Sequence, residues 1–119
     1  MKATSEIKIV LTTAPNLVVA KHLAESAIND KLAACVSFLS GMESLYWWKG
    51  QIETTSEVLV LFKTHVSKLE ALERMISQHH PYETPEFVVL PVESASEKYL
   101  NWLVSSLAGA PETHEESAP

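Results

Sequence analysis

The sequence predicts an α+β fold in which strands and helices alternate in the order β-α-β-β-α-β-α. Short runs of β-branched and aliphatic residues indicate the strands, and apolar residues spaced three or four apart indicate the helices. The first six elements match the ferredoxin-like arrangement, in which two helices cover one face of a four-stranded antiparallel sheet. We expect a single domain over residues 1–108 and an acidic, flexible tail over 109–119.

The first strand and helix are predicted from residues 6 to 31. Residues 6–13 are rich in Ile, Val, Leu and Thr, and Pro15 ends the strand. Asn16 is a favourable N-cap, so we expect it to begin a helix that reaches about residue 31.

The second and third strands are predicted to form a hairpin. The second covers residues 33–39, bends or bulges at Ser40-Gly41, and resumes over 44–48. Lys49-Gly50 indicates a tight turn into the third strand, residues 52–64.

The remaining elements are a helix, a strand and a last helix. The strand is predicted over residues 86–92, and Pro81 ends the helix before it. Two capping boxes, each a serine with a glutamate three residues later, predict where the second and third helices begin: Ser67 with Glu70, and Ser94 with Glu97.

The predicted hairpin is too long for the helices to cover. A helix of about 14 residues is roughly 21 Å long, whereas the two hairpin strands reach roughly 45 Å. An arm over residues 43–56 must therefore extend past the helices, with Trp47 opposite Ile52 and Tyr46 opposite Glu53. Because this arm is apolar, it must be covered either by loops or the third helix of its own chain, or by neighbouring subunits of a closed oligomer.

Composition limits the function classes. Nine basic and 15 acidic residues give a net charge of −6, so we expect neither a nucleic-acid nor a membrane partner. A single cysteine, Cys35, cannot form an internal disulfide, and we expect a buried, inert thiol in a cytoplasmic protein without a secretory signal. The sequence contains no recognised catalytic or phosphate-binding motif, so we predict a non-enzymatic protein without an organic cofactor.

The densest polar cluster follows the second helix, at residues 79–86. His79 and His80 could be ligands of copper or zinc, since imidazole suits both ions. The alternative is a helix terminus, where histidine interacts favourably with the helix dipole. Adjacent residues point in different directions, which makes it difficult for the two histidines to bind one ion together. The residues alone leave both interpretations open.

The sequence resembles the CutA family of divalent-cation-tolerance proteins in six segments that occur in order: LTTAP at 11–15, KLAACV at 31–36, SLYWWKG at 44–50, residues 56–64, HPYETPE at 80–86 and YLNWL at 99–103. The resemblance implies a cytoplasmic homotrimer, similar to the PII signalling proteins and assembled through its long hairpin arms, that acts in tolerance to metal ions. His79 and His80 match the paired histidines of the family's proposed copper site. Thr12 stands where some members have a cysteine, which leaves a weaker histidine site for Cu²⁺ or another divalent cation.

Two functions are therefore expected, beside a third hypothesis of a purely structural, very stable scaffold whose metal response is indirect. The first is a non-enzymatic homotrimer that binds copper or other divalent metal ions and acts in the response to them. The alternative is a PII-like signalling module, which would bind a small molecule or partner protein in clefts between subunits. The residues expected to line such a pocket are Trp47, Trp48, Tyr82 and Glu83.

Overall fold

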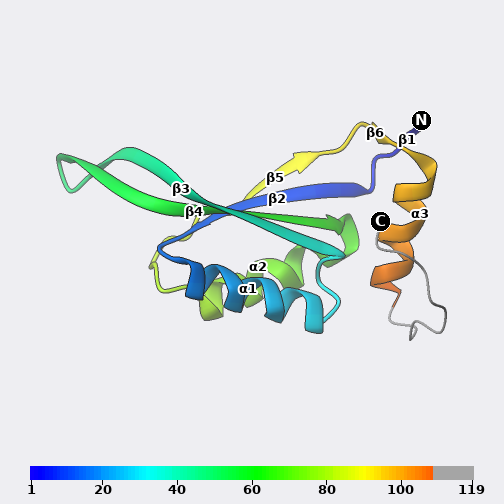
Figure 1. The fold of residues 1–119 in the computed structure, drawn as a ribbon, viewed down its shortest axis with the longest axis horizontal. Coiled ribbons are helices and arrows are strands. Elements are labelled where there is room, and N and C mark those ends of the chain that lie inside the picture. Colours follow the sequence, from blue (N-terminus) through cyan, green and yellow to red (C-terminus); the bar gives the residue numbers. More distant parts are fainter. Residues whose placement is uncertain (109–119) are drawn as a thin grey trace.

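A computed structural model of the chain describes residues 1–108, so the tail predicted over 109–119 lies outside the described residues. The main sheet has four strands in the order β3-β4-β2-β5, all antiparallel to their neighbours: β2 (Ile7–Ala14), β3 (Cys35–Trp48), β4 (Gln51–His65) and β5 (Val88–Pro91). Helices α1 (Leu17–Asn29) and α2 (Leu69–His79) pack together on one face of it (Figure 1). The remaining elements are a two-stranded sheet and a third helix: β1 (Lys2–Ala3), β6 (Ser94–Ala95) and α3 (Glu97–Leu107). The predicted ferredoxin-like arrangement is confirmed.

The main core lies between the sheet and the α1–α2 layer. Successive side chains of a strand point to opposite faces, so alternate residues of β2 and β4 face the helices. The fully buried residues come from all four elements: Val10 of β2, Val60 and Phe62 of β4, Leu23 of α1, and Leu72 and Ile76 of α2. As predicted, Asn16 caps α1, and its side chain accepts the Val19 N–H at 2.9 Å.

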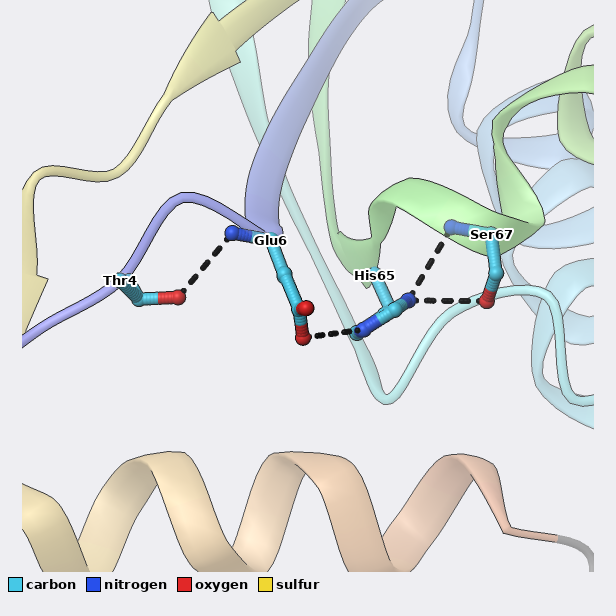
Figure 2. A network of polar contacts seen from close by, with 4 residues as sticks. All are labelled: Thr4, Glu6, His65 and Ser67. Carbon is cyan, nitrogen blue, oxygen red and sulfur yellow. Dashed lines mark hydrogen bonds and ion pairs between the residues drawn. The ribbon is translucent and has the colours of Figure 1, made fainter.

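The start of α2 differs from the prediction, because Ser67 and Glu70 do not form a capping box. A 3₁₀ turn, η1 (Val66–Lys68), precedes the helix, and His65 is its N-cap. His65 Nδ1 accepts the Ser67 N–H at 3.1 Å and lies 2.8 Å from Ser67 Oγ, while Nε2 donates to the Glu6 carboxylate at 3.0 Å (Figure 2). The turn begins before the helix, so the first free N–H groups lie within reach of His65 rather than of Ser67.

The capping box predicted at Ser94 and Glu97 is also wrong. Ser94 pairs with the N-terminal segment in the β1–β6 sheet, which no pattern in the sequence indicates. Ser96 caps α3 instead, and its Oγ accepts the Tyr99 N–H at 3.3 Å. α3 packs against the start of β2 in a second small core: Ile7, Leu100, Leu103 and Leu107.

The turn and the bulge of the hairpin lie where the sequence predicts them. Lys49 and Gly50 have φ values of 51° and 79°, as a two-residue type I′ turn requires. The predicted pairs, Trp47 with Ile52 and Tyr46 with Glu53, are formed. β3 carries one extra residue between Leu39 and Met42, where Gly41 has a φ of 87°.

The arm extends past both helices and gives the subunit a long axis of 51 Å against 27 and 25 Å (Figure 1). β3 and β4 have 14 and 15 residues, whereas α1 and α2 have 13 and 11. Leu45, Trp47 and Ile52 remain 68%, 72% and 62% exposed in the subunit. Among residues 1–108, neither loops nor α3 cover them, and α3 lies at the opposite end of the sheet. The alternative in which loops or α3 cover the arm is therefore wrong.

One buried polar group in the core lacks a partner. Thr12 of β2 is fully buried, and its Oγ1 forms no hydrogen bond within the described part of the chain. Thr64 of β4 is equally buried, but its Oγ1 donates to the Leu32 carbonyl at 2.7 Å. An unpaired buried hydroxyl destabilises the folded state by about 1–3 kcal/mol.

We expect Thr12→Val to raise the free energy of unfolding by about 1 kcal/mol, since it removes an unpaired hydroxyl and keeps the side-chain shape. Thr64→Val is the matched control and should lower it by about 1 kcal/mol, because the Leu32 carbonyl loses its donor. Denaturant unfolding at equal protein concentration measures both. A loss of stability in Thr12→Val would contradict this assignment.

Candidate functional site

His80 is the residue directly after α2, and the structure places it in the interior. It is 8% exposed, and its ring contacts the Tyr82 ring at a centroid distance of 4.7 Å. Nε2 lies 2.7 Å from the Thr13 carbonyl oxygen, so it carries a proton and donates it. Nδ1 accepts the Tyr82 N–H at 3.1 Å. Both ring nitrogens are therefore engaged, and a metal ion could bind His80 only if one of these bonds broke.

His79, the last residue of α2, is exposed and faces a different neighbour. Its Nδ1 lies 3.3 Å from Nε2 of His22, an exposed residue of α1. The two rings are arranged edge to face, with centroids 5.1 Å apart and planes at 68°. The structure thus brings His79 together with His22, while His80 at the next position turns into the interior.

Residues 1–108 contain no group of three or more His, Cys, Asp or Glu side chains close enough to hold a metal ion. Thr12 is fully buried in the core, and Cys35, which we expected to be buried, is only partly so, with Sγ 4.0 Å from Ser37 Oγ. A metal ion held by the described residues of one chain would therefore keep open positions for water or a second molecule.

A second polar pair lies at the base of the arm. The Tyr82 hydroxyl donates to the Glu57 carboxylate at 3.0 Å, and Glu57 is only 8% exposed although it carries a charge. Burial of Tyr82, the hydrogen bond to Glu57 and the negative charge of that carboxylate raise the pKa of Tyr82 to about 12. The pair attaches the loop after α2 to β4.

The four residues predicted to line an intersubunit pocket do not meet within one chain. Trp47 lies five residues beyond Met42, the β3 partner of Glu57, which is about 17 Å along an extended strand. Trp48 is farther out, and Glu83 is exposed in the loop. A shared pocket would need a neighbouring chain, so it stays a prediction.

Two residues of this region, His22 and Glu57, were not among the predicted site residues. Glu57 could have been noticed from the sequence, because it is a carboxylate directly between the arm and the apolar run 58–62. His22 gave none, since its contact with His79 spans 57 positions and depends on how α1 and α2 pack.

We expect the tyrosine titration of the wild-type protein to contain one component near pH 12 that Tyr82→Phe removes. Glu57→Gln should lower this pKa, although burial keeps it above 10. Because an unfolded tyrosine titrates near 10, the contribution of Tyr82 to the unfolding free energy should be constant below pH 10 and fall between pH 10 and 12. Ultraviolet difference spectra of the wild type and Tyr82→Phe isolate the Tyr82 component, and a midpoint near 10 for that component would contradict the prediction.

No helix among residues 1–108 is long and apolar enough to cross a membrane.

The sequence profile of the family described as "CutA1 divalent ion tolerance protein" matches residues 8–106. A divalent-cation tolerance protein CutA of Yersinia pestis is 48% identical over 99 residues, or 83% of each chain. The structure of CutA from Synechococcus elongatus is 39% identical with a TM-score of 0.87, covering 90% of this chain and 95% of that one. The structure of CutA1 from Oryza sativa is 40% identical with a TM-score of 0.85, covering 92% of this chain and 100% of that one. This chain belongs to the CutA1 family of divalent ion tolerance proteins.

Proposed function

We propose that this protein is a non-enzymatic homotrimer that binds copper or another divalent cation and acts in the cell's response to metal ions. The observation that carries the proposal is an exposed imidazole, that of His79, at the end of α2 in a chain of the divalent ion tolerance family. A cytoplasmic location is part of the proposal and fits the single free thiol.

The proposed assembly is supported by the apolar arm. Further exposed aromatic and aliphatic side chains lie on both edge strands of the sheet: Phe38 and Leu39 on β3, and Val88, Val89 and Leu90 on β5. Exposed apolar side chains together with open strand edges are typical of an interface. Three subunits are proposed from the resemblance to the PII-like trimers.

The proposed metal ligands are the predicted residues His79 and His80. His79 has only an exposed contact with His22 to give up, whereas His80 must first give up a buried bond to Thr13 or a bond to Tyr82. Imidazole suits Cu²⁺ and Zn²⁺, and with few protein ligands the ion would exchange readily. Such a site fits a protein that responds to metal ions better than one that needs a metal to fold.

A signalling role at intersubunit clefts remains the second candidate. The observation that favours it is the Tyr82–Glu57 pair at the base of the arm, where a partly buried hydroxyl and a carboxylate are held at the edge of a surface that a neighbouring chain would enclose. Trp47 and Trp48 would then reach the cleft from the arm of that neighbour.

We expect light scattering to give the wild-type protein a mass about three times that of the 13.2 kDa chain. Trp47→Asp should lower this mass, because it places a charge in the proposed interface. Val18→Asp is the matched control, since Val18 is 78% exposed on α1 and is not part of the arm, and it should leave the mass unchanged. A wild-type mass of one chain would refute the assembly.

We expect calorimetric titration with Zn²⁺ or Cu²⁺ to show binding to the wild-type protein. The His79→Ala/His80→Ala double variant should bind much more weakly. A Cys35→Ser background removes the thiol as a competing ligand, and circular dichroism checks that each variant folds. Absence of binding to the wild type would refute the metal-binding function, and equal heats from both proteins would remove these two residues from the site.

A further inference from the structure

The contact between His22 and His79 joins two helices through side chains that neither the core nor a cap explains. His22 lies in the first half of α1, and His79 ends α2. Both rings are exposed, and Nε2 of His22 lies 3.3 Å from Nδ1 of His79. Without a metal, one ring donates its N–H to the lone pair of the other.

The separation of these two nitrogens suits a shared metal ion. Imidazole nitrogens bind Zn²⁺ at about 2.0–2.1 Å, and two such ligands at a tetrahedral angle lie about 3.3 Å apart. An ion can therefore take the place of the shared proton if the two exposed side chains reorient, with the helices left in position. The ligands would come from different elements, which the packing of α1 on α2 has already brought together.

The alternative pair is less suited to binding. His80 already uses both ring nitrogens, and it is 8% exposed. Its ring is directed toward Thr13 and Tyr82, whereas His79 is directed toward α1. For His79 and His80 to share an ion, a buried hydrogen bond must break, which leaves an unpaired buried polar group.

We propose that His22 and His79 together bind one divalent transition-metal ion that links α1 to α2, with His22 rather than His80 as the second protein ligand. This inference rests on the metal-binding function proposed above and replaces His80 with His22 as the second of its two ligands. Two imidazoles favour Cu²⁺, Ni²⁺ or Zn²⁺ over Mg²⁺ or Ca²⁺, which prefer oxygen ligands. Water completes the coordination.

The test is a calorimetric titration of the full-length chain with Zn²⁺ and with Ni²⁺, in the Cys35→Ser background. His22→Ala and His79→Ala should each weaken binding by on the order of tenfold or more, because each removes one of two nitrogen ligands. Lys21→Ala, an exposed neighbour on α1, is the matched control and should bind like the parent. His80→Asn distinguishes the two ligand pairs: retained binding supports His22 with His79, and lost binding in a folded variant supports His79 with His80.

A second measurement on the parent protein does not depend on how the variants fold. On addition of Zn²⁺, the imidazole C–H signals of His22 and His79 should shift by nuclear magnetic resonance, while those of His80 keep their positions. Metal should also raise the melting temperature of the parent and of Lys21→Ala, but not of His22→Ala.

The two proposals fail in different ways. If the parent binds Zn²⁺ and His22→Ala binds equally well while a change at His79 or His80 removes binding, this inference is overturned and the proposed metal-binding function stands. If the parent binds neither Zn²⁺ nor Ni²⁺, this inference is overturned, and the Cu²⁺ titration described above then decides the metal-binding function. Binding that survives loss of His22, His79 and His80 would also overturn the inference.

Discussion

The length of the β3–β4 hairpin relative to the helices is the constraint on which the rest of the molecule depends. Helices of 13 and 11 residues cover the half of the sheet that holds the main core, and the strands continue beyond them. The covered half can fold around Val10, Phe62 and Leu72 within one chain. The uncovered half has exposed apolar side chains, and no element of residues 1–108 forms a layer over them, so its surface favours association.

Features encoded by neighbouring residues were predictable from the sequence, and those that depend on distant contacts were not. The Lys49-Gly50 turn fixes its own φ values and thereby the register of the whole arm. The caps at Ser67 and Ser94 were mispredicted although the motifs are local. A 3₁₀ turn shifted the first, and pairing of Ser94 with the N-terminal segment displaced the second. The contact of His22 with His79 depends on helix packing, which no short motif encodes.

The end of α2 gives two adjacent histidines different chemistry. The helix keeps His79 on its exposed face, and the change to an extended backbone at His80, with φ −85° and ψ 137°, turns the next side chain inward. There the Thr13 carbonyl and the Tyr82 N–H fix the tautomer of His80, which makes it part of the structure. A sequence motif of two histidines thus contains one residue free to act as a ligand and one that connects β2 to the loop after α2.

The outer edge of β3 has a consequence for how the protein behaves on dilution. β3 is an edge strand of 14 residues, and within the described chain its outward N–H and C=O groups form no ladder. A single chain would expose this unpaired strand edge to other extended polypeptides. Aggregation would therefore compete with folding and with the proposed assembly. The folding yield and the melting temperature should then depend on protein concentration as well as on the packing within each subunit.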